Sequence, residues 1–394
     1  MAVAQLRPVD GSFGDVPRGL KGVVVAETRM GDVRGLEGFY HYRQYSAIEV
    51  ATKCSFEEAW YLVLEGELPD RSELARFDGQ VRPLRFVPES LREVLPAIAR
   101  AGAAGAGPLE GLRTAVSLLA TAEGFKPTLD IDGSSLRTDA LRACAVVPTI
   151  IAALHRLASG LEPVEPDPDL GHAANYLYML SGEAPEERPA RALEQYMAST
   201  IDHGFNASTF TARVVTSTGA DLGSALVAAI GSLSGPLHGG APSRALDTLD
   251  AIGTPERTDE WVRRAVSSGE RIMGFGHPVY KTVDPRSQML KEIARSFGGP
   301  LFEFAETVES SVLRLLAELK PDRQLHTNVE FYAGVVMELC GLPRALFTPT
   351  FAVSRTVGWC AHVLEQASDN RIIRPAARYV GPPPPQPVPS LSDR

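Results

Sequence analysis

Apolar residues at helical spacing recur along most of this chain, and this pattern constrains its fold more than any other feature. In residues 55–69, SFEEAWYLVLEGELP, the apolar side chains on one helical face are Phe56, Ala59, Trp60 and Val63. Ser55 and Glu58 precede them in the arrangement of a capping box, and Pro69 marks the end of the segment. The segment therefore predicts an amphipathic helix with a defined start.

The same spacing returns in VESSVLRLLAELK, whose apolar positions are Val308, Val312, Leu315, Leu316 and Leu319. TPERTDEWVRRAVSSG predicts another helix, with Thr254 as N-cap and Pro255 as its first residue. Segments with strand periodicity are few, and residues 22–28 and 38–45 are the best candidates for a small N-terminal sheet. We therefore expect a mainly α fold with a small N-terminal β element.

The composition is that of a globular protein with a large core. Of the 394 residues, 44% are hydrophobic and 22% are charged, and this length suggests two domains or one large body with a smaller one. The net charge of −9 argues against a general nucleic-acid binder, because phosphate backbones require a basic face. Any site for a small anion must then be built locally from a few arginines and histidines.

Nothing in the sequence indicates export or a membrane span. The start MAVAQLRPVDGSFGD lacks the pattern of a signal peptide, and the best candidate for a membrane helix, residues 143–154, is short and broken by Pro148. The four cysteines show no metal-ligand spacing and are expected to be reduced thiols; they are Cys54, Cys144, Cys340 and Cys360. We expect a cytoplasmic protein.

Three segments read as connections: residues 101–111, residues 162–171 and the proline-rich C-terminal stretch GPPPPQPVPSLSDR. The last is expected to be an extended or disordered tail. In residues 221–235 small and large residues alternate at helical spacing, which allows close approach of another helix. Core packing and a helix-on-helix subunit interface explain that pattern equally well.

Three histidines stand in turns marked by glycine or proline: His203 in DHGFN, His238 in GPLHGGAP and His277 in GFGHPVY. Loops on a rigid scaffold are where functional sites are built, so these three are candidate site residues. The other five histidines lack such a context and are expected to be structural; they are His41, His155, His172, His326 and His362. The spacing of the three fits no zinc motif, and GFGHPVYK matches neither a dinucleotide fingerprint nor a P-loop.

Arginines and one carboxylate complete the set of candidates. Arg286, Arg355 and Arg374 stand beside turn-formers or apolar residues, where a guanidinium is suited to bidentate capture of carboxylate groups. Glu330, in NVEFYAG, lies between Val329 and Phe331. A carboxylate in that setting is either ion-paired and structural or a base whose pKa is raised by burial.

Several long motifs resemble those of the citrate synthase family, in the family's order. They are HGFNASTFTARVVTSTGADLGSALVAAIGSLSGPLHGGAP, RIMGFGHPVYKTVDPR, NVEFYAGVV, FAVSRTVGWCAHVLEQ and RPAARYVGP. GLKGVVVAET, YHYRQYSAIEVATKCSFEEAWYLVLEGELP and LEGLRTAVSLL resemble the family's N-terminal part. The likeness covers nearly all of residues 19–382.

The resemblance implies a homodimer of mainly helical subunits, each with two domains. The large domain would comprise residues 1–237 and 337–382, the small domain residues 238–336, and the tail residues 383–394. The active site would lie between the domains. The implied reaction joins acetyl-CoA to oxaloacetate and hydrolyses the citryl thioester to citrate and CoA, with no metal or prosthetic group.

The resemblance also implies a role for each candidate residue. His238 would hydrogen-bond the thioester carbonyl, His277 would polarise the oxaloacetate ketone, and Glu330 would be the general base. The oxaloacetate ligands would be His203, Arg286 and Arg355, together with Arg374 donated across the dimer interface. The CoA contacts would come from Lys281, Gly274 and Gly276.

Three positions depart from the common family motifs. Glu330 replaces the usual aspartate and is longer by about 1.5 Å, one carbon–carbon bond. Gln44 stands in place of a glycine, and Pro278 in place of an arginine common in bacterial members. We expect Glu330 to act as the base. The alternatives are a 2-methylcitrate synthase that uses propionyl-CoA and an inactive paralogue that binds CoA or oxaloacetate.

Overall fold

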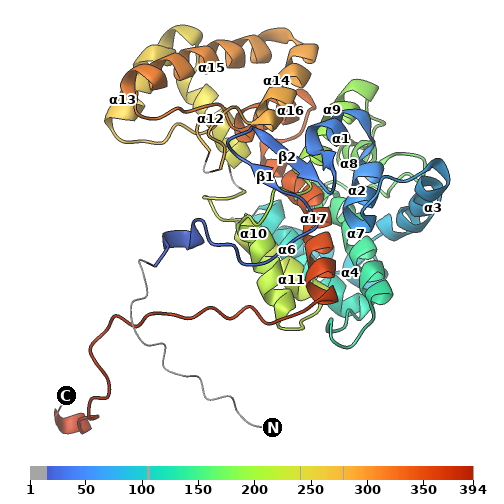
Figure 1. Cartoon of the computed structure of the whole chain (residues 1–394). Helices are drawn as coiled ribbons and strands as arrows, with labels where there is room; N and C mark the ends of the chain where they lie inside the picture. The colour runs from blue at the N-terminus through green and yellow to red at the C-terminus, as the bar shows by residue number, and fades with distance from the viewer. Residues whose placement is uncertain (1–15, 104–106, 240, 278, 394) are drawn as a thin grey trace.

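The computed structural model of the chain describes residues 16–103, 107–239, 241–277 and 279–393. Its fold is mainly α, as expected, and the helices form a large and a smaller group (Figure 1). The large group consists of α1 (Ala47–Lys53), α2 (Phe56–Glu65), α3 (Arg71–Val81), α4 (Glu89–Arg92), α5 (Leu95–Ala103), α6 (Pro108–Glu123), α7 (Gly133–Ala158), α8 (His172–Ser181), α9 (Glu187–Thr200), α10 (Ala207–Ser217), α11 (Leu222–Leu233) and α17 (Phe347–Ser368). The smaller group consists of α12 (Ala241–Ile252), α13 (Thr258–Ser267), α14 (Pro285–Phe297), α15 (Gly299–Leu319) and α16 (Val329–Leu339).

The N-terminal β element is a three-stranded antiparallel sheet in the order β1 (Val33–Arg34), β2 (Phe39–Tyr42), β3 (Tyr45–Ser46). The prediction of β structure in residues 38–45 is confirmed, although the segment forms a β2–β3 hairpin, in which Tyr42 pairs with Tyr45, rather than one strand. The prediction of a strand in residues 22–28 is wrong. Its valines are exposed, and no strand of the described chain lies beside them to pair with.

The predicted helix starts agree with the structure in part. The Ser55–Glu58 capping box is present at the start of α2. The helix ends at Gly66, whose φ of 101° lies in the left-handed region, and so before Pro69. At Thr254 the side chain makes no capping hydrogen bond, and Pro255 opens a 3₁₀ turn that leads into α13.

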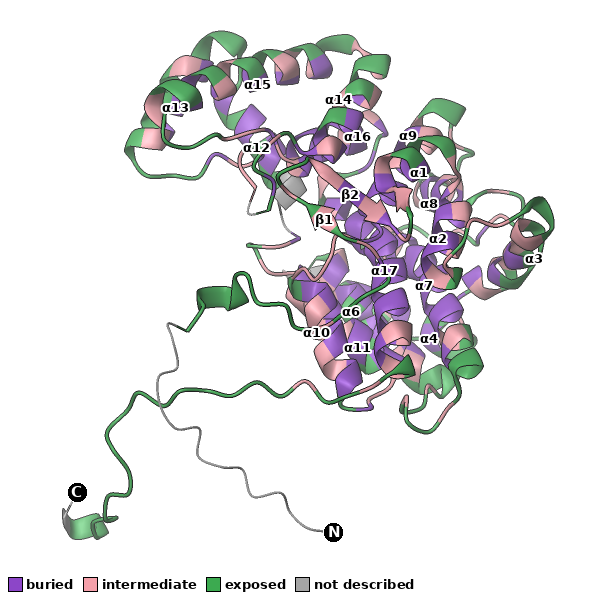
Figure 2. Cartoon of the chain, viewed as in Figure 1, coloured by how far each residue is buried: buried purple, intermediate pink, exposed green. Residues whose placement is uncertain are grey.

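Helix α17 lies at the centre of the large group and is buried along most of its length (Figure 2). It packs against α7, α10, α11 and α9. Helix α7 runs without a break through Pro148, so the expected interruption at this proline is wrong. By length and composition α7 alone among the described helices could cross a membrane, but 78% of its apolar window is buried inside the protein.

Packing within the chain accounts for the small residues on one face of α11. A Cβ atom on Gly223 would lie 2.2 Å from the Cβ of Ala120, so glycine is required where α11 crosses α6. Around Gly231, by contrast, a Cβ would meet nothing within 4 Å. Core packing is therefore confirmed for one face of α11, and the other face is open for a further contact.

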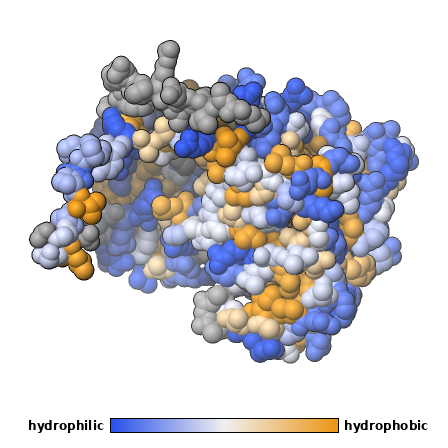
Figure 3. Space-filling model, turned by 90° about the horizontal axis from the view of Figure 1, so that it is seen from below, coloured by the Kyte–Doolittle hydropathy of each residue, from blue (hydrophilic) through white to orange (hydrophobic). Residues whose placement is uncertain are grey.

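After α17 the chain runs as an exposed, irregular segment that leaves the body of the protein (Figure 1). A short 3₁₀ turn, Leu391–Asp393, is its only regular part within the described residues. Apolar residues also reach the surface elsewhere, and the view from below shows apolar patches among polar residues (Figure 3). The most exposed apolar side chains include Leu237, Val24 and Val380.

Candidate active site

The predicted histidines His203 and His277 meet beside Arg286, between the two groups of helices. The ring centroids of the two histidines are 5.8 Å apart, and His203 Nε2 lies 2.9 Å from the Tyr280 hydroxyl. Tyr40, on β2, packs against His203, and the Arg286 guanidinium lies over its ring. Elements far apart in sequence thus place Tyr40, Tyr280 and the Arg286 guanidinium around the two histidines.

The geometry around His277 fixes its tautomer. The backbone amides of Val279 and Tyr280 both donate to Nδ1, each at 3.0 Å. Burial lowers the pKa of His277 to about 4, and the nearby Arg286 acts in the same direction. The ring is therefore neutral near pH 7 and carries its hydrogen on Nε2. Arg286 Nη2 is 3.5 Å from that atom, so two donors stand ready for one acceptor oxygen.

His238 has the opposite tautomer. Its Nε2 lies 3.4 Å from the Ser208 amide, which can only donate, and 2.8 Å from the Ser208 hydroxyl. Trp359 Nε1 donates to that hydroxyl and holds it in place. Burial lowers the pKa of His238 to about 4, helped by the charge of Arg355. A neutral His238 therefore carries its hydrogen on Nδ1, away from Ser208.

The two arginines of the site differ in how their charge is compensated. Arg286 makes a bidentate, buried ion pair with Asp284, with bonds of 3.0 and 2.8 Å. Arg355 is only 1% exposed, and its Nε donates to the Thr200 carbonyl at 2.9 Å. In the described parts of the chain no carboxylate lies within ion-pairing distance of Arg355. The charge of Asp202 acts on Arg355 from beyond pairing distance, so the guanidinium has no direct ion pair and its donors suit a bound anion.

Glu330 is the second residue of α16, whose N-cap Asn328 accepts a hydrogen bond from its amide. Its carboxylate makes no hydrogen bond or ion pair with any described side chain. Burial raises the pKa of Glu330 to about 8, against the lowering effect of Arg286 and Arg355. Of the two roles that its apolar neighbours allowed, the ion-paired structural carboxylate does not fit. The geometry is that of a carboxyl group with raised proton affinity.

A short backbone ladder fixes the loop of His277 to the start of α16. Gly276 N donates to the His326 carbonyl at 2.8 Å, and Asn328 N donates to the Gly274 carbonyl at 2.9 Å. Gly274 has a φ of 89°, and a Cβ there would lie 2.9 Å from the Phe331 ring, so no other residue fits. The ladder therefore fixes the backbone beside the His277 imidazole relative to the backbone beside the Glu330 carboxylate.

Of the remaining predicted residues, Lys281 is near the site and Arg374 is not. Lys281 is exposed, and its charge lowers the pKa of His277 after burial and Arg286. Arg374 is exposed on the segment after α17 and has no bond to the cluster of this chain. Gln44 lies in the β2–β3 turn and bonds to Glu67, so this departure does not touch the site. Pro278 lies outside the described residues.

Sequence reasoning missed the acidic residues that hold the site. Asp284 binds Arg286 and also accepts from the amide of Val329, at 3.1 Å, so it joins α14 to α16. Its place two residues before Arg286 was a usable signal. Glu309, buried on α15, accepts from Thr327, Tyr332 and Lys291 at 2.6, 2.6 and 2.8 Å. No local pattern links it to the segment around Glu330.

The fold and the site together define a class of enzyme. Neutral imidazoles present N–H donors, a carboxyl group has its pKa near neutrality, and two guanidinium groups attract anions. This set suits removal of a proton from carbon beside a carbonyl group, with stabilisation of the oxyanion that develops. Among the described residues no group of three or more metal-ligating side chains comes together.

Comparisons with known proteins agree with this class. The family model described as citrate synthase, C-terminal domain, matches residues 19–376. Citrate synthase from Deinococcus radiodurans is 37% identical over 374 residues, which cover 94% of this chain and 97% of the relative. The 2-methylcitrate synthase of Mycobacterium tuberculosis is 39% identical over 367 residues, covering 93% and 91%.

A solved structure shares the fold. Citrate synthase from Thermoplasma acidophilum, solved in a ternary complex with carboxymethyl coenzyme A and oxaloacetate, superimposes on this chain with a TM-score of 0.88 at 29% identity, covering 96% of this chain and 100% of that one. The chain belongs to the citrate synthase family. It is thus an enzyme of the citrate synthase type, an acyltransferase.

Proposed function

We propose that the protein condenses acetyl-CoA with oxaloacetate and then hydrolyses the citryl-CoA thioester, releasing citrate and CoA. The observation that carries the proposal is Glu330, an unpaired carboxylate with a raised pKa in the field of two arginines. Relatives named citrate synthase, 35–39% identical over most of their length, support it. The structure solved from Thermoplasma acidophilum holds carboxymethyl coenzyme A and oxaloacetate, ligands of this kind.

In the proposed mechanism Glu330 removes a proton from the methyl group of acetyl-CoA. His238 donates its Nδ1 hydrogen to the thioester carbonyl and stabilises the enol that forms. As the enol carbon attacks the ketone carbon of oxaloacetate, the enol hydrogen returns to His238 and His277 Nε2 gives its hydrogen to the ketone oxygen. The proton that Glu330 took then restores His277, so the net change moves one proton from the methyl group to the new hydroxyl. Water then cleaves the thioester, so that the carboxylate of citrate and the free thiol of CoA leave.

The charges of the site support a second subunit as part of it. Oxaloacetate carries two carboxylates, yet Arg286 is already paired with Asp284, and only Arg355 is uncompensated. We infer that the protein is a homodimer in which Arg374 reaches the site of the partner. The open face of α11 around Gly231 supplies a surface where another helix can approach closely.

We also place the enzyme in the cytoplasm.

Subunit mixing tests this arrangement. Arg374→Leu and His277→Ala homodimers are each expected to be inactive, because every site lacks one group. In a mixed dimer one site regains both groups, so random mixing of equal amounts should restore about a quarter of wild-type activity. If no activity returns although mixed dimers form, Arg374 acts in its own subunit or not at all.

The division into domains is part of the proposal. Helices α12 to α16 form the smaller group (Figure 1), which supports a small domain beginning near residue 238. The expected boundary between residues 336 and 337 falls inside α16, Val329–Leu339, and a continuous helix moves as one unit. We therefore place the boundary after α16. We propose that this domain closes over the active-site cleft, which an unchanged radius of gyration on addition of oxaloacetate would contradict.

Release of free CoA thiol tests the proposed reaction directly. With oxaloacetate and acetyl-CoA we expect oxaloacetate-dependent thiol release from the purified protein. Propionyl-CoA is run in parallel, since the relative from Mycobacterium tuberculosis, of similar identity, is named 2-methylcitrate synthase. One methyl group in an apolar pocket shifts specificity by about 1–3 kcal/mol, so the ratio of kcat/KM values assigns the donor. Binding of oxaloacetate without release from either donor would identify an inactive paralogue.

A further inference from the structure

Helix α17 carries a stripe of polar side chains through an otherwise apolar core. The stripe consists of Arg355, Trp359, His362 and Gln366, at i, i+4, i+7 and i+11. Each has a partner outside α17: Arg355 bonds to Thr200, Trp359 to Ser208, His362 to Asp202 and Gln366 to Arg213. Arg355 is one of the proposed oxaloacetate ligands, while His362, two turns further along, contacts no proposed substrate group.

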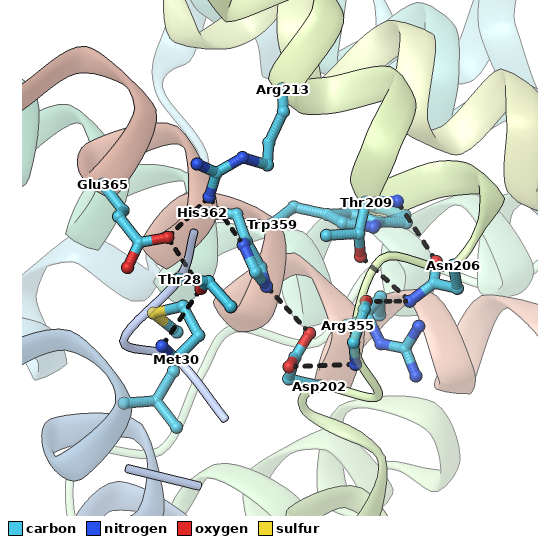
Figure 4. A network of polar contacts seen from close by, with 12 residues as sticks. Thr28, Met30, Asp202, Asn206, Thr209, Arg213, Arg355, Trp359, His362 and Glu365 are labelled. Carbon is cyan, nitrogen blue, oxygen red and sulfur yellow. Dashed lines mark hydrogen bonds and ion pairs between the residues drawn. The ribbon is translucent and has the colours of Figure 1, made fainter. Parts of the chain in front are cut away.

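The partners of His362 fix the direction of its two hydrogen bonds (Figure 4). Arg213 Nη1 lies 3.1 Å from Nδ1, and because arginine can only donate, Nδ1 is the acceptor. The ring hydrogen is then on Nε2, which lies 3.1 Å from Asp202 Oδ1. All three side chains are buried, so the chain Arg213–His362–Asp202 has one defined arrangement.

Asp202 directly precedes His203, one of the proposed oxaloacetate ligands. Its second oxygen, Oδ2, accepts from the Gly204 amide at 3.3 Å, so the carboxylate holds the peptide unit that follows His203. Burial raises the pKa of Asp202, but the combined effects of His362, Arg355 and the Gly204 amide outweigh it and the net pKa is lowered. The carboxylate is therefore ionised and accepts both bonds.

On the other side of His203, Phe205 contacts Arg213 and His362. The Phe205 ring lies 4.8 Å from the Arg213 guanidinium and makes an edge contact with the His362 ring, at 5.5 Å between centroids. Residues 202–205 are thus held on both sides of His203. Glu365 anchors Arg213 in turn, at 2.6 Å, and also accepts from Thr28 and from the Arg29 amide.

We infer that His362 is a positioning residue that sets the place of His203 for oxaloacetate, acting through Asp202 and Phe205. This inference rests on the proposed function. His362 touches no reacting atom, so its loss should weaken oxaloacetate binding and leave the acyl-CoA side of the site unchanged. His362→Phe keeps the ring volume and removes both hydrogen bonds. His362→Gln keeps an N–H donor toward Asp202.

The experiment compares wild type, both His362 variants and Val363→Ala. Val363 is the next residue of α17 and equally buried, so its truncation lowers stability without touching the polar chain. We expect His362→Phe to raise the KM and the calorimetric Kd for oxaloacetate by about 10- to 100-fold, as for loss of a hydrogen bond to a charged group. The KM for acetyl-CoA should not change. His362→Gln should recover most of the loss, and Val363→Ala should lower Tm alone.

An unchanged oxaloacetate Kd in folded His362→Phe would overturn the inference, and so would equal effects of His362→Phe and Val363→Ala. If His362→Phe does not fold, Phe205→Leu removes the ring contact without leaving a buried charge unpaired. An unchanged oxaloacetate Kd in that variant would also overturn it. The binding measurement needs no turnover, so a wild-type protein that binds oxaloacetate without thiol release refutes the proposed function only.

Discussion

Glu330→Gln is expected to abolish condensation while the protein stays folded. The amide cannot accept the methyl proton, and loss of a general base costs about 10²- to 10⁴-fold in rate. Thiol release with saturating oxaloacetate and acetyl-CoA measures the effect. Glu303→Gln, the same change at an exposed position of α15, is the matched control and should be fully active. Turnover retained by Glu330→Gln would remove Glu330 from the mechanism.

Glu330→Asp tests whether the geometry of this site requires the longer side chain of glutamate. The ladder between the Gly274–Gly276 loop and Asn328 fixes the backbone beside the carboxylate. Retracting the carboxylate by about 1.5 Å should then lower kcat by up to about 100-fold. An aspartate variant as fast as wild type would mean that catalysis at this site does not require the extra methylene of Glu330.

Glu330→Gln should be more stable than wild type at alkaline pH. The pKa of Glu330 is about 8 in the folded protein and about 4.3 in an unfolded chain. Between these values the folded state binds more protons, so the stability of wild type falls as pH rises. The Tm difference between variant and wild type should grow from pH 5 to pH 8 and then level off. A constant difference would show that Glu330 has an ordinary pKa.

Arg355→Leu should lose most of its affinity for oxaloacetate. The guanidinium is buried, has no counter-ion among the described residues and is free to bind a carboxylate. Charge-assisted hydrogen bonds are worth about 1.5–3 kcal/mol each, so losing a bidentate pair should raise KM by about 10²- to 10⁴-fold. Initial rates against oxaloacetate concentration measure this, with Arg314→Leu, at an exposed ion pair, as control.

Without ligand, Arg355→Leu should be no less stable than wild type, because a buried cation without a directly paired carboxylate is costly. A large drop in Tm together with an unchanged KM would make Arg355 a structural residue. Such a result would also remove the charge argument for a second arginine from the partner subunit.

The helices could be predicted from sequence because their apolar spacing and caps are local. The strand expected in residues 22–28 failed for the opposite reason: three consecutive valines favour extended backbone, but a strand needs a neighbour that the segment itself does not reveal. Pro148 in α7 shows the same limit. Burial in the core outweighs the cost of a proline that, read locally, ends a helix.

For the site, glycine-marked turns and the family motifs led to His203, His238, His277, Glu330 and the two arginines that the structure brings together. The supporting residues gave no such signal. Asp202 and His362 are 160 positions apart and meet only through the packing of α17. The polar residues of the α17 stripe follow the helical period, but in sequence a buried polar stripe has the same period as an apolar one. Only its partners distinguish the two.

The position of α17 near the end of the chain has a consequence for synthesis on the ribosome. Arg213 and Asp202 emerge about 150 residues before the helix that pairs them, a separation given by their bonds to Glu365 and His362. Until α17 has left the exit tunnel, these charges lack their partners His362 and Glu365, and the loop of His203 lacks the support of His362. A nascent chain of this enzyme therefore has no complete oxaloacetate site until α17 has formed.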